Sequence, residues 1–181
     1  SFLQGPAQAP QAIRNVLHNG SANLFAENGI DIDSPMITDK GDHLISDYFE
    51  IEQITLSHLN ERTRPFTLGG DHSITFPVIR ALHKCQRGFD ILHIDAHADL
   101  YHEFEGDPYS HACPFARIME NGLAAGLVQV GIRTLNEHQR EQAAKFDVEI
   151  HEMKHWDLKL LPNFARPIYI SLDMDAFDPA C

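Results

Sequence analysis

Short apolar runs alternate with amphipathic segments along most of this chain. Apolar runs of strand length predict β-strands, and apolar residues spaced three or four apart predict helices. The predicted strands are 65–68, 89–94, 127–132, 148–151 and 167–172, with a short one near 35–38. The predicted helices are 10–17, 51–60, 74–84, 114–121 and 136–146. From residue 65 onward the two kinds of element therefore follow one another regularly.

This alternation predicts the fold class. Strands that are apolar on both faces and separated by helices are typical of a parallel sheet with helices packed on its two faces. We find no internal repeat, low-complexity tract or linker in the sequence. We therefore expect residues 1–181 to form a single α/β domain with three layers, helix, sheet and helix.

Polar residues follow three of the predicted strands. In chain order they are His72, then Asp95, His97 and Asp99, then Asp173 and Asp175. In an extended chain, residues two apart share a face, so the Asp-Ala-His-Ala-Asp run can point two carboxylates and an imidazole the same way. The carboxyl ends of parallel strands meet at one edge, where such sheets bind their ligands. The sequence therefore predicts one shared site.

The chemistry of these six side chains indicates metal ions. Four carboxylates and two imidazoles are more ligands than a single tetrahedral zinc takes, and they suit two cations that share carboxylates. Oxygen-rich ligand sets favour manganese over metals that prefer sulfur. We therefore expect two Mn²⁺ ions, with nickel or another divalent metal as the alternative.

Composition and charge narrow the class of partner. The formal net charge is −12, from 26 acidic and 14 basic residues, which argues against nucleic acid and anionic membranes and suits a cationic substrate. No apolar run reaches the roughly 20 residues that a membrane helix needs. The three cysteines are far apart in the sequence, which favours a reduced cytoplasm. The chain starts without Met and ends at Cys181, so we expect both ends to be incomplete.

Three segments of the chain resemble a known family. Gly69-Gly70-Asp71-His72-Ser73, Asp95-Ala96-His97-Ala98-Asp99 and the run from Ser171 to Pro179 look like the three signature motifs of the ureohydrolases, which include arginase, agmatinase and formimidoylglutamase. The motifs occur in the family's order and at suitable separations. The resemblance implies the α/β arginase fold and a binuclear manganese hydrolase that splits a guanidino group into urea and an amine.

The resemblance also assigns roles to individual residues. His72 and Asp99 would bind the first metal, and His97 and Asp175 the second. Asp95 and Asp173 would bridge the two ions, which would activate a water molecule to attack the guanidinium carbon. Asp71 and Asp178 are expected to orient ligands or to serve as turn residues.

The leaving amine requires a proton, and His111 is the predicted catalytic donor. It lies in the loop after the Asp-Ala-His-Ala-Asp motif, near where the family places a proton-shuttling histidine, and imidazole has a suitable pKa. His102 is a weaker candidate in the same loop.

The substrate prediction depends on residues after Asp99. Arginase has an Asn where this chain has Tyr101, which resembles the agmatinase branch, and Glu103, Glu105 and Asp107 make the loop acidic. Agmatine, giving putrescine and urea, is therefore the expected substrate. Guanidinobutyrate, arginine and formimidoylglutamate stay open as alternatives. The family's guanidinium-binding carboxylate would lie beyond Cys181.

The resemblance also predicts a homo-oligomer, a trimer or a hexamer. Two other classes are compatible with the ligand types. One is an inactive metal-binding scaffold, although all six ligand positions are intact. The other is a two-metal phosphoesterase, although no basic cluster that could hold a phosphate lies near the motifs.

Overall fold

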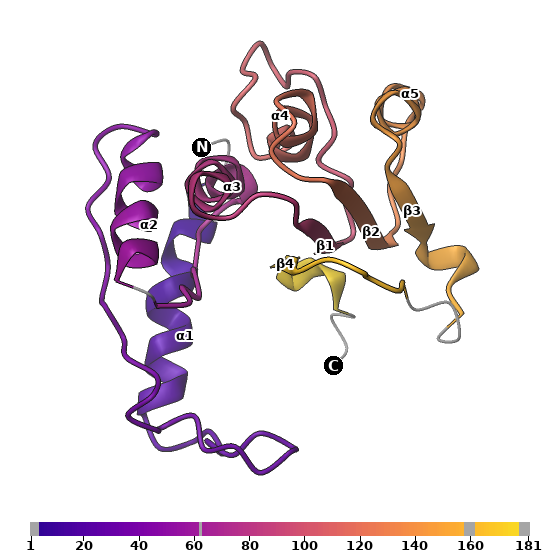
Figure 1. The fold of residues 1–181 in the computed structure, drawn as a ribbon. Coiled ribbons are helices and arrows are strands. Elements are labelled where there is room, and N and C mark those ends of the chain that lie inside the picture. The colour runs from indigo at the N-terminus through magenta and orange to yellow at the C-terminus, as the bar shows by residue number, and fades with distance from the viewer. Residues whose placement is uncertain (1–3, 62, 158–161, 178–181) are drawn as a thin grey trace.

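A four-stranded parallel sheet forms the centre of the molecule, as the computed structural model in Figure 1 shows. The structure describes residues 4–61, 63–157 and 162–177. The strands are β1 (Asp90–Ile94), β2 (Gly126–Ile132), β3 (Glu149–Glu152) and β4 (Ile168–Leu172), in the order β3-β2-β1-β4. The predicted α/β class and parallel sheet are confirmed.

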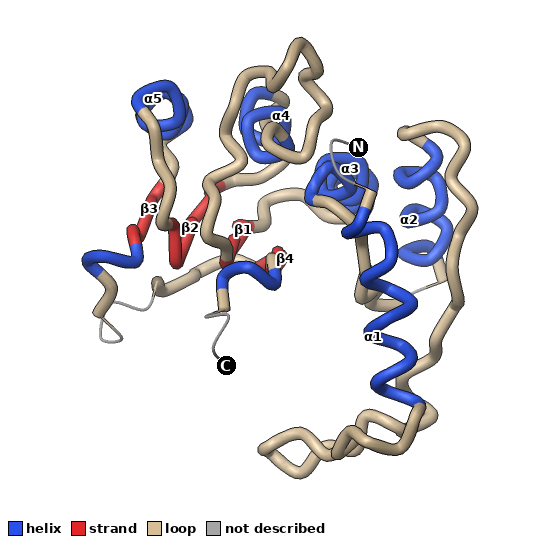
Figure 2. The backbone as a smooth tube through the Cα atoms, turned by 180° about the vertical axis from the view of Figure 1, so that it is seen from behind, coloured by secondary structure: helices blue, strands red, loops and turns tan. Residues whose placement is uncertain are grey.

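The helices fall into two groups. Within the described residues, the α-helices are α1 (Ala9–His18), α2 (Glu50–Asn60), α3 (Thr75–Cys85), α4 (Pro114–Glu120) and α5 (Glu137–Phe146). Short 3-10 turns in the same part of the chain are η1 (Gly5–Gln8), η2 (His72–Ile74), η3 (Met153–His155) and η5 (Met174–Ala176). Helices α3, α4 and α5 lie over one face of the sheet, whereas α1 and α2 lie beside α3, away from the strands (Figures 1 and 2).

The covered face of the sheet carries the hydrophobic core. Alternate residues of β1 and β2 point to that face, where Ile91 and Leu127 pack against Ile79 of α3 and Phe115 and Ile118 of α4. Burying such side chains contributes about 1.5–3 kcal/mol each, so this face holds the strands in register. On the opposite face, Ile168, Ile170 and Leu172 of β4 are 41%, 55% and 49% exposed.

Two of the predicted strands are wrong. Residues 65–68 and 35–38 belong to no strand, and Phe66 is 88% exposed. An apolar run becomes a strand only when a neighbouring edge accepts its backbone hydrogen bonds, and neither run meets such an edge within the described residues. In the second stretch the sequence Asp33-Ser34-Pro35 forms turns instead.

A buried carboxylate joins α2 to α3. Glu52 is only 2% exposed, and its two oxygens lie 2.9 Å from Arg80 Nε and 2.5 Å from Lys84 Nζ. A buried charge is tolerated when it is paired in this way. The helical spacing of the sequence does not identify this contact, because it depends on a second helix. None of the described helices has the length and apolar character needed to cross a lipid bilayer.

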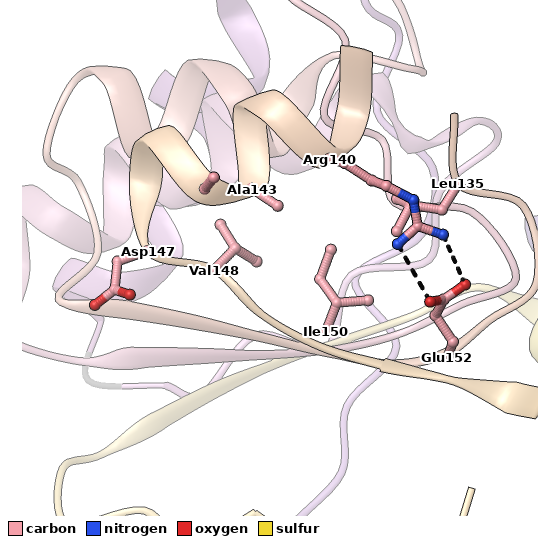
Figure 3. Close-up of a pocket in the computed structure, with 8 residues that line it drawn as sticks. Leu135, Arg140, Ala143, Asp147, Val148, Ile150 and Glu152 are labelled. Atoms are coloured by element: carbon pink, nitrogen blue, oxygen red, sulfur yellow. Dashed lines mark hydrogen bonds and ion pairs between the residues drawn. The ribbon is translucent and has the colours of Figure 1, made fainter. Parts of the chain in front are cut away.

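A hollow of about 340 Å³ lies between α5 and β3 (Figure 3). Ala143, Val148 and Ile150 form its apolar wall, and an ion pair between Arg140 and Glu152 closes one side. It shares no residue with the polar clusters described below. The candidate site is therefore not this hollow but a set of side chains at the edge of the sheet.

Candidate metal centre

The register of the sheet aligns the predicted ligands. Ser171 of β4 pairs with His93 of β1, which pairs with Gln129 of β2, so the three side chains share one face. Hydrogen bonding continues beyond the strands, because Asp95 N donates to Val130 O at 3.1 Å and Asp173 N donates to Ile94 O at 2.9 Å. The carboxylates of Asp95 and Asp173 thus start from adjacent positions at the carboxyl edge.

A first cluster surrounds the His72 imidazole. Its Nδ1 atom lies 3.0 Å from a carboxylate oxygen of Asp99, 3.1 Å from one of Asp95 and 3.7 Å from one of Asp173. The other ring nitrogen, Nε2, lies 2.8 Å from Ser171 Oγ. Among the described residues, Nδ1 is buried and has no partner at hydrogen-bonding geometry. His72 therefore directs an uncommitted nitrogen toward three carboxylates.

Asp99 reaches this cluster through an unusual backbone conformation. Its φ of 48° lies in the left-handed region, which Asp tolerates better than most residues. The chain turns sharply there, and Asp99 O accepts a hydrogen bond from Phe115 N at the start of α4. The sequence after β1 is typical of an exposed loop. The turn nevertheless places the Asp99 carboxylate in a buried position next to His72.

A second cluster lies beside the first. His97 Nδ1 is 3.0 Å from an Asp175 oxygen and 3.5 Å from an Asp95 oxygen. Asp175 also accepts a hydrogen bond of 3.2 Å from Ala96 N, which ties η5 to the loop after β1. The two groups with metal-binding spacing are His72, His93, Asp95 and Asp99, and Asp95, His97 and Asp175. Asp95 belongs to both.

Five of the six predicted ligands therefore converge on two neighbouring clusters, and Asp173 stands beside the first. One member of the first cluster, His93, was not predicted as a site residue. The sequence holds a signal for it, because His93 precedes Asp95 by two positions in a strand and so shares its face. Its two ring nitrogens already contact Asp95 and Gln129.

The close packing of charges shifts several pKa values. Burial of His72 opposes its charged form, but contacts with Asp95 and Asp99 outweigh burial and raise its pKa to about 10. Contact with Asp95 raises the pKa of His97 to about 9. Burial would raise the pKa of Asp95, yet three surrounding histidines hold it well below the usual range. Burial and the charge of Asp173 raise the pKa of Asp175.

These observations fit a site for divalent cations. Carboxylate oxygens and imidazole nitrogens are the ligands that manganese, nickel and zinc accept. Nδ1 of His72 lies 3.0–3.1 Å from the Asp99 and Asp95 carboxylates, although among the described residues it makes no hydrogen bond of good geometry. Bound cations would relieve the repulsion that raises the pKa of Asp175.

The loop between Asp99 and α4 carries the predicted proton donor. His111 Nδ1 lies 3.2 Å from Ser110 Oγ, and its ring meets Phe104 edge-on at 5.6 Å between centroids. His102 is engaged differently, because its Nδ1 lies 3.1 Å from the Arg117 guanidinium of α4. The catalytic role of His111 stays a prediction, whereas the contact of His102 with Arg117 gives that residue a structural function.

Tyr101 is held on α5. Its hydroxyl accepts a hydrogen bond of 2.6 Å from the Asn136 side chain, and its ring stacks on His138 at 5.8 Å between centroids. The residue that distinguishes this chain from the arginase pattern is thus fixed from the side of α5 rather than free to rotate.

Asp71 and Arg133 support the turns that carry two of the predicted ligands. Asp71 precedes η2 and accepts a hydrogen bond of 3.1 Å from Ser73 N, so it is a turn residue that positions His72. Arg133, directly after β2, donates to the carbonyl oxygens of Asp175 and, at 3.2 Å, Ala176. Asp178 lies outside the described residues. Arg133 therefore holds the turn that presents Asp175.

Comparisons with known proteins agree with this geometry. The family model described as the arginase family matches residues 1–181. The chain is 44% identical over 201 residues to arginase 1, mitochondrial, of Arabidopsis thaliana, covering 99% of this chain and 59% of that protein. It is 41% identical over 136 residues to the N(1)-aminopropylagmatine ureohydrolase of Thermus thermophilus, covering 72% of this chain and 46% of that protein.

The solved structure of an arginase from Medicago truncatula superimposes with a TM-score of 0.91 at 43% identity. The match covers 99% of this chain and 63% of the Medicago chain. The chain thus spans about 60% of the length of these arginases.

Proposed function

Because this chain belongs to the arginase family, we propose that the full-length protein is a metal-dependent ureohydrolase. In this proposal it adds water to the guanidino carbon of a small cationic substrate and releases urea and a primary amine. The proposal rests on one observation above all others, which is that two clusters of imidazoles and carboxylates share Asp95 at the carboxyl edge of the sheet.

The two clusters support a proposed set of metal-binding roles. His72 and Asp99 would hold one cation, His97 and Asp175 the other, with Asp95 between them and Asp173 beside them. Two bound cations would lower the pKa of water at the site, so that hydroxide would be available as a nucleophile near neutral pH. Manganese is the proposed metal, since most of these ligands are carboxylates.

The remaining side chains act on the substrate. The site is acidic, so it attracts a guanidinium group, and Glu103, Glu105 and Asp107 add negative charge in the neighbouring loop. When the carbon–nitrogen bond breaks, the leaving amine needs a proton. We assign that proton to the His111 imidazole, which lies in the same loop.

L-Arginine is the substrate that we propose first. The supporting evidence is that arginases from Arabidopsis and Medicago align over 99% of this chain at 43–44% identity. The N(1)-aminopropylagmatine ureohydrolase of Thermus aligns over a shorter part, 72% of the chain. The products would be urea and ornithine.

Agmatine is the second candidate, and a specific observation favours it. Tyr101 stands where the arginase pattern expects an Asn, and the hydrogen bond from Asn136 holds its ring against α5. Agmatine lacks a carboxylate, so it gains nothing from an Asn at this position and avoids repulsion by the acidic loop.

A urea-release assay tests the proposal. The full-length protein, loaded separately with Mn²⁺ and Ni²⁺, is given arginine, agmatine, guanidinobutyrate and guanidinopropionate. We expect urea from arginine with the highest kcat/KM and from agmatine with a lower one. The reverse order would overturn the choice of arginine while leaving the reaction class intact.

Two controls separate the other classes. Mn²⁺ binding without urea from any guanidino compound would overturn the enzyme assignment and favour a metal-binding scaffold. Hydrolysis of a phosphate monoester in place of guanidines would favour a phosphoesterase. Formimidoylglutamate is followed by glutamate release, because that reaction gives formamide rather than urea.

The assembly and the compartment are proposals as well. A homo-oligomer is proposed for the full-length protein, and light scattering on a sizing column measures its mass. The cytoplasmic location is proposed from the scattered cysteines. The Arabidopsis relative is named mitochondrial, so fractionation of the source cells decides between the two compartments.

A further inference from the structure

A chain of hydrogen bonds beneath the metal centre ends on the shared carboxylate. It begins at the backbone oxygen of Ala98, between the proposed ligands His97 and Asp99. Gln129 Nε2 of β2 lies 2.6 Å from Ala98 O and 2.9 Å from His93 Nδ1. His93 Nε2 lies 2.7 Å from Asp95 Oδ2.

The direction of every bond in this chain follows from its first member. A backbone carbonyl only accepts, so the Gln129 amide must turn its nitrogen toward Ala98. The second hydrogen of that nitrogen then points at His93 Nδ1, which has to accept it. The imidazole proton is thereby placed on Nε2, where it is donated to Asp95.

Burial makes this arrangement rigid. Gln129 and His93 are both 0% exposed, and Asp95 is 1% exposed. The His93 ring packs against the Phe115 ring with 3.9 Å between centroids. The second carboxylate oxygen of Asp95, Oδ1, accepts a hydrogen bond of 2.7 Å from His97 N. Both oxygens of the shared carboxylate are therefore held from below by donors with a fixed direction.

We propose that Gln129 and His93 are positioning residues that orient Asp95 for two cations. This inference rests on the metal-binding part of the proposed function and deepens it. Partners of metal-ligating groups commonly change metal affinity about 10- to 100-fold when they are removed. Neither residue contacts the substrate in this proposal. Both position Asp95, and Gln129 also holds the backbone between His97 and Asp99.

A pair of substitutions at His93 separates donation to Asp95 from simple occupancy. In His93→Gln the amide nitrogen can take the place of Nε2 and still donate to Asp95. In His93→Asn the shorter side chain can still accept from Gln129 but does not reach Asp95. Gln129→Met keeps the volume of the side chain and removes the donor. Gln142→Met, a swap of the same kind at a buried position on α5, is the matched control.

The experiment titrates Mn²⁺ into the full-length protein after metal removal and follows heat of binding and stoichiometry. We expect His93→Gln and Gln142→Met to stay within about threefold of wild type, and His93→Asn and Gln129→Met to bind about 10- to 100-fold more weakly. Because the two residues act in series, the double variant with His93→Asn and Gln129→Met should bind Mn²⁺ no more weakly than the weaker of the two single variants.

Thermal unfolding of the same metal-free proteins supplies the second readout. If His93→Asn and Gln129→Met lower Tm but bind Mn²⁺ as tightly as wild type, the proposal is overturned, and the two residues only stabilise the core. Equal weakening in His93→Gln and His93→Asn would also overturn it. If His93→Asn does not fold, the Mn²⁺ affinity of Gln129→Met is compared with that of Gln142→Met instead. Wild-type protein that takes up no Mn²⁺ would instead overturn the proposed function.

Discussion

Asp95 shows at the residue scale how one side chain organises the site. Its carboxylate contacts the imidazoles of His72, His93 and His97, and it also accepts a hydrogen bond from His97 N. These contacts explain why its pKa is held low despite burial. The same carboxylate is the point where the two clusters meet, so its orientation affects both.

The proton donor can be tested by comparing two histidines of one loop. We expect His111→Ala to leave Mn²⁺ binding unchanged and to lower kcat about 100-fold, because departure of the amine would lose its general acid. His102→Ala is the control, since its imidazole contacts Arg117. Steady-state urea release measures both, and added imidazole should partly restore His111→Ala. A wild-type kcat in His111→Ala would remove this residue from the reaction.

The raised histidine pKa values predict proton release on metal binding. With pKa values of about 10 and about 9, His72 and His97 are protonated at pH 8 in protein stripped of metal. Metal ligation requires neutral imidazoles, so Mn²⁺ uptake at pH 8 should release about two protons. Affinity should therefore rise with pH until about pH 10. Calorimetry in buffers of different ionisation enthalpy counts the protons, and a count of zero would contradict the contacts described.

The same shifts set the stability of the stripped protein. Both histidines have a folded-state pKa above the unfolded value of about 6.5, so their contribution is complete below that pH. It is lost as pH rises through about 9 for His97 and about 10 for His72. Tm measured without metal should fall over this interval.

At the element scale, an irregularity in β2 makes room for the site. The register between β2 and β3 shifts between Val130 and Ile132, and Gly131 in between has a φ of +91°. A Cβ at Gly131 would lie 3.1 Å from Asp95 O. Two features therefore require glycine at position 131: the positive φ of its backbone and the close approach of the strand that presents Asp95.

Gly131→Ala tests this close approach. We expect the free energy of unfolding to fall by about 1–3 kcal/mol, because a left-handed conformation and a contact with Asp95 both penalise alanine. Mn²⁺ affinity should fall as well, since the Asp95 backbone has to move. Gly122→Ala is the matched control, with φ of +60° and no atom within 4 Å of its Cβ. Equal effects of the two substitutions on Mn²⁺ affinity would show that the contact with Asp95 is unimportant.

The charge of the molecule matters at the largest scale. The net charge of −12 and the acidic loop after Asp99 attract cations. The ionic strength of the solution sets the distance over which this attraction acts. Agmatine carries one more positive charge than arginine because it lacks the carboxylate. Electrostatic attraction should therefore favour agmatine at low ionic strength, whatever the contacts within the site prefer.

Ionic strength should consequently change the two substrates unequally. We expect KM for agmatine to rise about threefold between roughly 50 mM and 500 mM NaCl, and KM for arginine to rise less. Glu103→Gln with Glu105→Gln should reduce the dependence for agmatine. Initial rates of urea release at fixed pH give these values. Identical salt dependence for both substrates would mean that the acidic loop does not select between them.

The sequence by itself determined the class of fold and the kind of chemistry. Hydrophobic periodicity identified the strands β1, β2 and β4 because each is short and largely apolar, and it identified β3 from the position of Ile150 between α5 and the next turn. The spacing in the Asp-Ala-His-Ala-Asp run and the rule that ligands gather at the carboxyl edge were enough to select the metal-ligand candidates. These inferences depend only on local geometry.

Tertiary structure alone decided the contacts between distant residues. The runs 65–68 and 35–38 have the pattern of strands, but no sheet edge in the described part of the chain pairs with them. His93 and Gln129 lie side by side because of the register of β1 with β2. Packing of the whole covered face sets that register. The hydrogen bonds that orient Asp95 follow from it. No local pattern encodes them, because each joins segments that meet only after the sheet has formed.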